Sequence, residues 1–480
     1  MGLGDKMFKG MAWSAIEKVS VQAIQFFIQI ALARILTPSE YGTVGLLYVF
    51  IAISMVFIDS GFTKALIQKK NRSENDISTV FLFNIGISLI AYGILFFVAP
   101  FVSDFYDIEK LTLLLRVLAI SMIINALFSV PMTLYTIKLN FRVLTKINII
   151  SSILSGIVAY SMALFGYGVW ALVALTLLRS IITAILSWVM LKWKPNWVFS
   201  KKSFKELFSF GSNILVSSLL DVTVNKTYEL VIPKVSSVQD LGYYSRGAQN
   251  TGAIFNIINS IFHSVLLPSL TDIQDKLDLL VSHTRQIIKT AALLIIPVFL
   301  FLAAVAEPLV RVLLTEKWMP SVIIMQIFCF ARMVSIISGI NINILYVLGR
   351  SDLVLKQQYA KIFVRVILLV AAFKFGIIYI ALAELVATLV HFFINTYYPG
   401  KIMKYGATTQ IKDTFIILLC GIIMVLSVFC GTWFVESDIL KLIIAPIIAI
   451  PVYIGLVQLF KIKEYVLLKN KILEFTSNRK

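Results

Sequence analysis

Long apolar runs recur along the whole chain. Stretches such as 113–127 and 293–305 show no alternation of apolar and polar positions. A strand of a membrane β-barrel would alternate, whereas a spanning helix needs roughly 20 mostly apolar residues. The pattern therefore predicts membrane-spanning α-helices. They are expected near 12–34, 42–66, 79–102, 112–137, 146–166, 169–191, 208–232, 242–268, 285–306, 320–346, 358–374, 377–399, 414–434 and 440–460.

The composition strengthens this prediction. Hydrophobic residues make up 59% of the 480 residues and charged residues only 14%, against about 25% charged residues in soluble domains. We predict an all-α integral membrane protein with about fourteen transmembrane helices, the first span being retained. The three cysteines fall in apolar stretches, which gives no reason to expect a disulfide or a metal site.

The net charge of +18 is explained mainly by topology. With an even number of spans and both termini placed in the cytoplasm, 28 of the 43 basic residues fall on the inner side and seven in outer turns. Basic residues accumulate on the cytoplasmic side of membrane proteins. We therefore expect a multi-pass membrane protein with cytoplasmic termini, and no nucleic-acid partner. The basic linker 192–206 is expected to contact lipid headgroups, with docking of a partner as the alternative.

An internal repeat divides the first twelve spans into two groups of six. The segment SEYG at 39–42 aligns with QDLG at 239–242, an offset of 200 residues. The predicted domains are an N-terminal lobe at 1–200, a second lobe at 201–405, and a C-terminal helical hairpin with a basic tail at 406–480.

The first and seventh spans carry polar residues at helical spacing, which places each set on one helix face. Polar groups facing lipid are costly, so each face is expected to contact a cavity or another helix. Two such stripes favour a shared cavity, the arrangement of alternating-access transporters. The stripes are Ser14, Lys18, Gln22, Gln25 and Gln29, and Asn213, Ser217, Asp221, Asn225 and Tyr228.

Eight basic residues lie within predicted spans, and they exceed the acidic residues there. Some are expected to pair, as Lys226 can with Glu229 three residues later, and Lys64 and Arg246 lie close enough to span ends to reach the headgroups. Others can line a cavity for an anionic substrate, for which cations and amides suit a diphosphate and sugar hydroxyls. For Arg116, Arg179 and Arg365, helix packing is at least as good an explanation. The candidate substrate-binding residues are Lys18, Gln22, Gln25, Gln29, Lys64, Asn213, Asn225, Arg246, Asn250 and Arg332.

Two carboxylates are candidates for coupling transport to an ion gradient. Asp221 and Glu384 could hold Na⁺ or exchange protons, and His391 follows Glu384 on about the same face. Pairing with a nearby cation is the alternative. The chain has no phosphate-binding GxxxxGK[ST] loop, so we expect neither ATP hydrolysis nor a bound cofactor.

Short segments in a characteristic order resemble Wzx-type polysaccharide flippases of the MOP exporter superfamily. The resemblance covers about residues 8–400. It rests on ARILTPSEYG at 33–42, DSGFTKALIQ at 59–68, GYGVWAL at 166–172, LGYYSRGA at 241–248, LPSL at 267–270, EKW at 316–318 and LGR at 348–350.

This resemblance implies two six-helix lobes and a non-enzymatic exporter. Its expected substrate is an undecaprenyl-diphosphate-linked oligosaccharide for O-antigen, capsule or exopolysaccharide, which crosses the inner membrane of a bacterium. A proton or sodium gradient would drive the transport, and the polysaccharide polymerase machinery is the expected protein partner. It also implies that Lys18 and Arg246 lie near cation positions of relatives, and Asp221 near a seventh-helix acid. A drug or small-metabolite exporter of the same superfamily is the alternative; a membrane polymerase is disfavoured because the loops are short.

Overall fold

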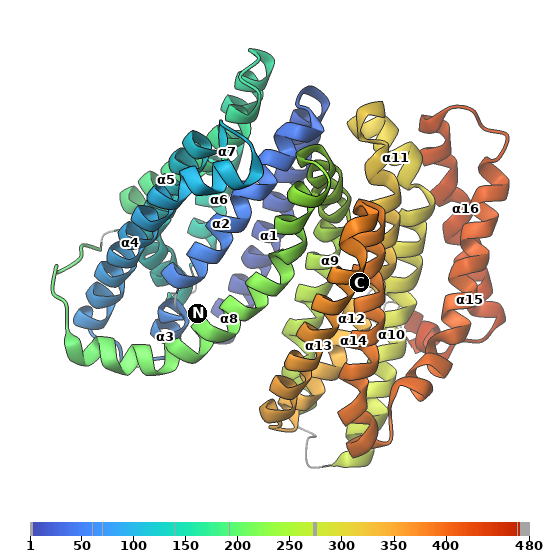
Figure 1. The fold of residues 1–480 in the computed structure, drawn as a ribbon. Coiled ribbons are helices and arrows are strands. Elements are labelled where there is room, and N and C mark those ends of the chain that lie inside the picture. Colours follow the sequence, from blue (N-terminus) through green and yellow to red (C-terminus); the bar gives the residue numbers. More distant parts are fainter. Residues whose placement is uncertain are drawn as a thin grey trace. The chain divides into compact units, whose positions relative to one another are not determined.

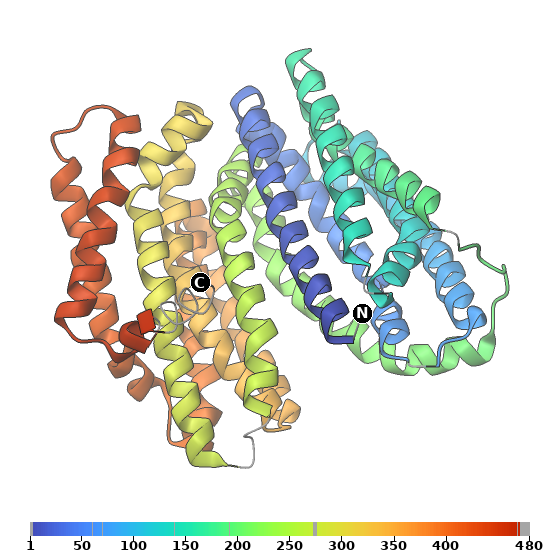
Figure 2. The ribbon, with the colours of Figure 1, turned by 180° about the vertical axis from the view of Figure 1, so that it is seen from behind.

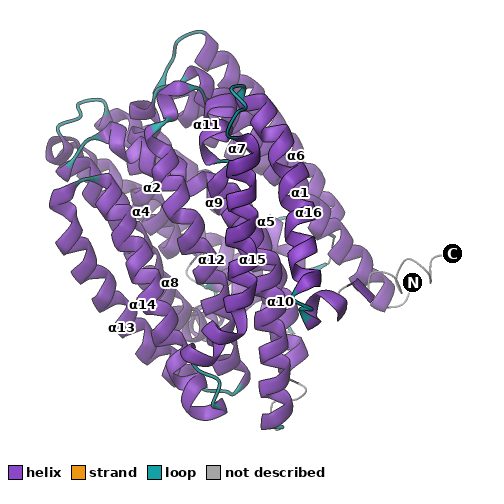
Figure 3. Cartoon of the chain, turned by 90° about the vertical axis from the view of Figure 1, so that its right-hand side faces the viewer, coloured by secondary structure: helices purple, strands orange, loops and turns teal. Residues whose placement is uncertain are grey.

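The computed structural model describes residues 3–59, 61–69, 71–138, 140–191, 193–271, 276–467 and 469–470. Throughout these ranges the regular secondary structure is helical, as Figure 3 shows in purple. The prediction of an all-α protein is confirmed for this part of the chain.

The chain forms two compact units, residues 1–242 and 243–480. In the first unit, α1 packs on α6, α6 on α7, α4 on α5, and α8 on α2. The boundaries proposed from the repeat, at 200 and 405, stay a prediction. The helices of this unit, drawn from blue to green in Figure 1, are α1 (Leu3–Ile35), α2 (Pro38–Asp59), α3 (Phe62–Gln68), α4 (Glu74–Tyr106), α5 (Leu111–Ile137), α6 (Phe141–Leu164), α7 (Val169–Met190) and α8 (Lys201–Val235).

In the second unit, α12 packs on α10 and α14, α13 packs on α14, and α15 packs on α10 and α16. Figure 2 shows this unit from behind. Its elements are α9 (Val238–Thr271), which starts just before the boundary, α10 (Leu277–Ala304), α11 (Ala306–Leu314), η1 (Glu316–Trp318), α12 (Pro320–Val347), α13 (Ser351–Ala372), η2 (Phe373–Phe375), α14 (Ile377–Met403), α15 (Ala407–Thr432) and α16 (Asp438–Leu459).

Ten helices in the described part of the chain are long and apolar enough to cross a membrane. They are α2, α4, α5, α6, α7, α10, α12, α14, α15 and α16. The long helices α1, α8, α9 and α13 are more polar, and α1 and α8 carry the predicted stripes. A multi-pass, all-helical membrane protein is therefore confirmed, and the count of fourteen spans is taken up below.

Two predicted segments differ from the observed helices. The span predicted at 42–66 is divided, because Gly61 has a φ of 69°, a left-handed conformation that glycine adopts without a steric penalty and that separates α2 from α3. The predicted spans leave residues 307–319 as a connection between two helices. This connection contains α11 and η1, with Trp318 fully buried.

The aligned segments of the internal repeat start two helices in the same way. At the start of α2, the Glu40 carboxylate accepts a hydrogen bond from the Thr37 backbone N–H (2.7 Å), and the Thr37 hydroxyl accepts one from the Glu40 N–H (3.3 Å). At the start of α9, the Ser237 hydroxyl accepts one from the Asp240 N–H (3.0 Å). Ser or Thr followed three residues later by an acid is a helix-capping pattern. The repeat therefore conserves a helix start as well as a sequence match.

The glycines that end these aligned segments come together within the first unit. A Cβ at Gly42 would overlap the Val238 carbonyl oxygen, and a Cβ at Gly242 would overlap the Pro38 carbonyl oxygen. Each glycine thus lets its own helix approach the first residue of the other helix. The reciprocal contact explains why glycine stands at both positions.

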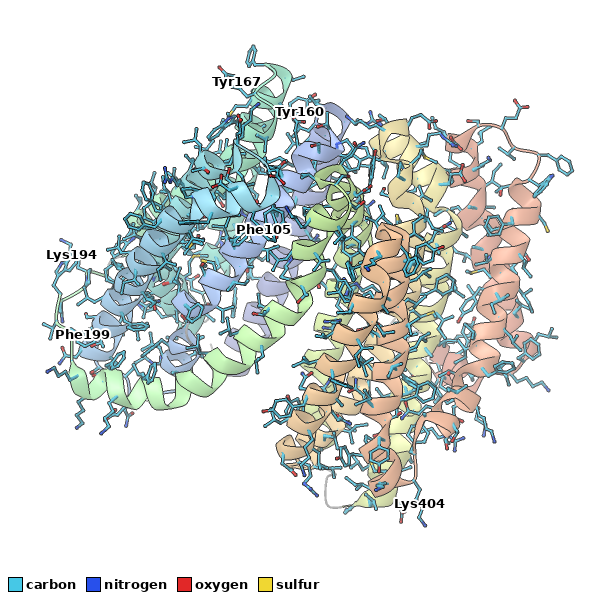
Figure 4. The ribbon with its side chains drawn as sticks, viewed as in Figure 1. Phe105, Tyr160, Tyr167, Lys194, Phe199 and Lys404 are labelled. Atoms are coloured by element: carbon cyan, nitrogen blue, oxygen red, sulfur yellow. The ribbon has the colours of Figure 1, made fainter. Side chains whose placement is uncertain are left out.

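The basic linker packs on the start of α4. The Trp193 Nε1–H donates to the Glu74 carboxylate at 2.9 Å, and the backbone N–H of Ser200 donates to the Thr79 hydroxyl at 3.0 Å. In Figure 4, Lys194 and Phe199 lie at one end of the first unit and Tyr167 at the other. The linker therefore has a fixed path, and its proposed contact with headgroups stays a prediction.

Ion pairs attach the C-terminal hairpin of α15 and α16 to the rest of the second unit near both ends. Asp438 and Glu307 carboxylates raise the pKa of the Arg311 guanidinium, which lies outside the spanning helices. Between the ends, the Tyr453 hydroxyl donates to the Leu293 carbonyl oxygen at 2.8 Å. The pairs are Arg285 with Asp413 (2.5 Å), Lys289 with Glu464 (2.7 Å) and Arg311 with Asp438 (3.1 Å).

Candidate functional site

A polar pocket of about 520 Å³ lies inside the first unit, between α1, α2, α5, α6 and α7. Eleven of its fourteen lining residues have polar side chains, which is unusual for a site among membrane helices because polar groups are costly there. Its volume is in the range of small-ligand sites. It is lined by Gln25, Ile28, Gln29, Tyr48, Asn125, Phe128, Asn148, Ser152, Ser155, Leu175, Thr176, Arg179, Ser180 and Thr183.

Arg179 of α7 is the charged residue among those that line the pocket. Its guanidinium faces the side-chain amide of Gln25 on α1. With the amide oxygen turned toward the guanidinium, Gln25 accepts hydrogen bonds from both terminal nitrogens, that from Nη2 at 2.9 Å. A guanidinium has five N–H donors, so Arg179 retains donors for a ligand.

Hydroxyl and amide groups form the rest of the pocket wall. The Tyr48 hydroxyl of α2 is hydrogen-bonded to the Thr176 hydroxyl of α7. The Ser180 hydroxyl donates to the Asn125 side-chain oxygen of α5 at 3.2 Å. These contacts link α2, α5 and α7 around the pocket.

One carboxylate lies beside the pocket without lining it. The Asn148 amide of α6 donates to the Glu17 carboxylate of α1 at 2.5 Å. Asn148 lines the pocket, whereas Glu17 is not among the residues that line it. The pocket wall itself therefore combines one cation with neutral donors and acceptors, a combination that suits an anion bearing hydroxyl groups.

Part of the polar stripe predicted on the first span lines the pocket. Gln25 and Gln29 line the pocket, and Gln22 lies on the same helix one turn earlier without lining it. The backbone of the other predicted residues is helical, but their side chains lie outside the described part of the structure. These residues are Lys18, Lys64, Asn213, Asp221 and Asn225.

A second group of charges lies inside the other unit. Arg365 of α13 and Glu384 of α14 form an ion pair at 2.7 Å, with side chains only 12% and 13% exposed. The second Glu384 oxygen, Oε2, is buried without a hydrogen-bond partner in the described structure. His391 lies about two turns further along the same face of α14, and its Nε2 is 3.2 Å from the Lys361 carbonyl oxygen. Glu384 therefore pairs with a nearby cation, which was the alternative to a role in ion coupling.

The predicted cations of the second unit pack on aromatic rings. The Arg332 guanidinium of α12 lies 4.7 Å from the Phe255 ring centroid and 5.5 Å from that of Phe328. Arg246 of α9 is 3% exposed and lies 5.9 Å from the Trp318 ring centroid.

A predicted polar residue on α9, Asn250, has its amide 3.8 Å from the Met325 sulfur. None of these three side chains lines the polar pocket of the first unit, and their role as substrate ligands stays a prediction.

Two other intramembrane cations are satisfied locally. Lys226 pairs with Glu229 at 2.7 Å, which confirms the predicted pair. Arg116 donates from Nε to the Phe96 carbonyl oxygen at 3.1 Å and lies 4.0 Å from the Phe96 ring centroid. For Arg116, the helix-packing explanation is therefore the one that the geometry supports.

Several pocket residues were not among the predicted ligands. Thr176, Arg179, Ser180 and Thr183 follow one another at helical spacing on α7, and this third stripe was the signal that could have identified them. Asn125 and Asn148 belong to two further stripes at helical spacing, with Ser121 and Ser129 on α5 and with Ser152 and Ser155 on α6. Tyr48 stands among apolar residues, so only the folded helices bring it to the pocket.

Comparison with known proteins places the chain in a family of polysaccharide biosynthesis proteins. The family described as "Polysaccharide biosynthesis protein" matches residues 31–323. The chain is 25% identical over 412 residues to the teichuronic acid biosynthesis protein TuaB of Bacillus subtilis, which covers 85% of each chain. It is 21% identical over 370 residues to the lipopolysaccharide biosynthesis protein WzxC of Escherichia coli, which covers 76% of this chain and 74% of that relative.

Solved structures agree on the fold. The inward closed conformation of the lipid II flippase MurJ matches with a TM-score of 0.74 at 15% identity and covers 94% of this chain and 98% of MurJ. An inward-facing multidrug resistance MATE family transporter of the MOP superfamily matches with a TM-score of 0.61 at 14% identity, over 82% of this chain and all of that chain. The predicted resemblance is thereby confirmed: the chain has the fold of MOP-superfamily transporters and belongs to the polysaccharide biosynthesis protein family.

Proposed function

We propose that this protein is a flippase that moves undecaprenyl-diphosphate-linked oligosaccharide repeat units across the bacterial inner membrane by alternating access. The family and the relatives support export of a polysaccharide precursor. The observation that carries the choice of substrate is the pocket of the first unit, in which Arg179 faces neutral amides and hydroxyls.

The chemistry of the pocket matches the polar part of such a substrate. A guanidinium binds phosphate oxygens through charge-assisted hydrogen bonds, while amides and hydroxyls both donate to and accept from sugar hydroxyls. A pocket of about 520 Å³ has room for a sugar or a diphosphate, not for the whole carrier. We assign Arg179 to the diphosphate and the Gln25, Gln29 and Asn125 amides to sugar hydroxyls, with Lys18 as a further cation on the same helix as the glutamines.

The multidrug exporters that share this fold suggest the alternative substrate class. A site for a cationic drug needs acidic and aromatic side chains. Among the described residues that line the pocket, the one charged side chain is Arg179. An anionic substrate is therefore favoured by simple charge complementarity.

Fourteen spans with cytoplasmic termini complete the proposed topology. The helices α1, α8, α9 and α13 join the ten apolar spans, since their polar faces can turn toward the protein interior. Ion coupling is assigned to Asp221 and Glu384, either through Na⁺ or through a proton exchanged on a carboxylate. Glu384 supports this assignment because one of its oxygens is buried and has no hydrogen-bond partner among the described residues.

Deletion of the gene tests the function. We expect loss of surface glycan and accumulation of the carrier-linked repeat unit in the cytoplasmic leaflet, restored by the wild-type gene. Accumulation in the outer leaflet would contradict a flippase. Unchanged glycan with increased sensitivity to cationic dyes would instead support the drug-exporter alternative.

Complementation with Arg179→Gln tests the site. We expect at least a tenfold loss of transport at wild-type protein levels, since a charge-assisted hydrogen bond contributes about 1.5–3 kcal/mol. Arg116→Gln is the matched control, because Arg116 is held by the Phe96 carbonyl and ring away from the pocket. Equal transport by both variants would remove the proposed site while leaving the function open.

A further inference from the structure

A groove of about 350 Å³ lies between α13 and α14 of the second unit. These two helices run side by side in Figures 1 and 3. The groove opens outward, since Phe393 and Tyr397 at its edge are 52% and 54% exposed. It is lined by Lys356, Gln357, Ala360, Val390, Phe393, Ile394, Tyr397 and Tyr398. We name it the α13–α14 groove.

The floor of the groove contains a polar atom that is not satisfied. Gln357 is 2% exposed, and its Nε2 donates to the carbonyl oxygens of Ile394 (2.7 Å) and Asn395 (3.3 Å). Its Oε1 is buried and accepts no hydrogen bond within the described structure. A buried acceptor without a donor is costly, so a ligand that brings a hydroxyl group would gain a hydrogen bond here.

Unneutralised positive charge lies at one end of the groove. Lys356 lines it, and the Lys401 ammonium lies 4.8 Å from the Tyr397 ring centroid. Lys404, labelled at the end of α14 in Figure 4, lies nearby in sequence. Within the described ranges none of these three lysines forms an ion pair with a carboxylate. An anionic group is therefore the complementary ligand.

The position of the groove on the helices indicates what can reach it. α14 is long and apolar enough to span the membrane, so acyl chains surround its exposed face. The end that carries Lys356 and Lys401 is strongly basic, whereas the opposite end carries Lys374. By the distribution of positive charge, the groove faces the cytoplasmic leaflet, where anionic headgroups are attracted to lysines.

We propose that the α13–α14 groove binds one anionic phospholipid of the cytoplasmic leaflet, of the phosphatidylglycerol type. The phosphate lies between Lys356 and Lys401, a glycerol hydroxyl donates to Gln357 Oε1, and one acyl chain follows Ala360 and Val390. The site is separate from the substrate pocket of the first unit and does not depend on the function proposed for it.

Native mass spectrometry of the full-length purified protein tests this proposal. We expect the wild type to retain one phosphatidylglycerol after delipidation and titration, and phosphatidylcholine of the same chain length to bind at least tenfold more weakly. Lys356→Ala combined with Lys401→Ala should weaken phosphatidylglycerol binding at least tenfold. Lys374→Ala, at the opposite end of the same helix pair, is the matched control and should bind as the wild type does.

Further variants separate the headgroup from the chain. Val390→Trp fills the groove without altering any charge and should also weaken binding at least tenfold, and Gln357→Leu should reduce the preference for phosphatidylglycerol over phosphatidic acid, which lacks the glycerol hydroxyls. Glycerol 3-phosphate should not compete. Equal binding by the double lysine variant, equal binding of phosphatidylcholine, competition by glycerol phosphate, or displacement by polyprenyl phosphate at lower concentration would each overturn the proposal. An unchanged thermal unfolding temperature shows that the variants fold.

Discussion

Arg179 of the first unit differs from the arginines of the second unit in its surroundings. In the first unit, Arg179 faces an open pocket and a neutral amide, Gln25. In the second unit, Arg365 is paired with Glu384 in nearly complete burial, and Arg332 packs on aromatic rings. One guanidinium thus keeps donors available, while the others are neutralised or covered.

Because of this difference, we expect the first-unit arginine to affect ligand binding and the second-unit ion pair to affect the stability of the fold. A buried ion pair is costly to break because either remaining charge is left without its partner, so the second-unit cluster is expected to contribute chiefly to stability and to coupling. A cation beside an open polar pocket can be hydrated when empty, so its removal is expected to affect a ligand more than the fold. The following changes test that separation.

Glu384→Ala is expected to have the largest effect. It leaves Arg365 and the nearby Arg332 without a buried carboxylate, and breaking such a pair costs about 3–5 kcal/mol. The thermal unfolding temperature of the purified protein, followed by loss of a monodisperse peak on size exclusion, measures this loss.

The double variant Glu384→Met, Arg365→Met is the control for that prediction. Replacing both charges with apolar side chains of similar length is often neutral, so most of the lost stability should return. A double variant as unstable as Glu384→Ala would show that the ion pair is not the cause. A single variant as stable as the wild type would remove the contrast between the units.

Ser155→Leu should have a smaller effect on the fold and a clear effect on transport. Ser155 is fully buried and lines the pocket, so a leucine can occupy pocket volume instead of displacing neighbours. We expect at least a fivefold loss of transport, with a change in the free energy of unfolding under about 1 kcal/mol, since overpacking costs about 1–3 kcal/mol only where no space exists.

Ser151→Leu is the matched change one turn earlier on α6. Ser151 is equally buried but does not line the pocket, and its hydroxyl donates to the Asn148 carbonyl oxygen. It should therefore lower stability more than Ser155→Leu. The reverse order of stabilities would mean that the pocket is not open space for a side chain.

The sequence predicted the fold better than it predicted the site, for physical reasons. Continuous apolar runs and the distribution of basic residues indicate spanning helices directly. The stripe on α1 predicted Gln25 and Gln29 as cavity residues because helical spacing defines a face. For Arg179, the sequence left helix packing and cavity lining as alternatives. Only its contact with Gln25 on another helix decides between them.

Contacts between helices were the hardest to predict. Asn125 and Asn148 each lie on a polar helix face, but their partners lie 55 and 131 residues away in sequence. Likewise, the pairing of Arg365 with Glu384 depends on how α13 and α14 pack, which the spacing along one helix does not contain. The capping pattern shared by Thr37 and Ser237, by contrast, is local, and it lies beside the segments that the repeat aligned.

Tyr48→Phe is expected to have the smallest effect. It removes only the hydroxyl that is hydrogen-bonded to Thr176, and the net contribution of one such bond is about 0.5–1.5 kcal/mol. Because Tyr48 joins α2 to α7 at the pocket wall, we expect a two- to tenfold loss of transport and a matching small loss of stability. Thr176→Val should give the same loss, and the double variant no more than either, since both remove one bond. Additive losses of transport in the double variant would instead mean that each hydroxyl contacts the substrate separately, and would enlarge the binding site assigned to the first unit.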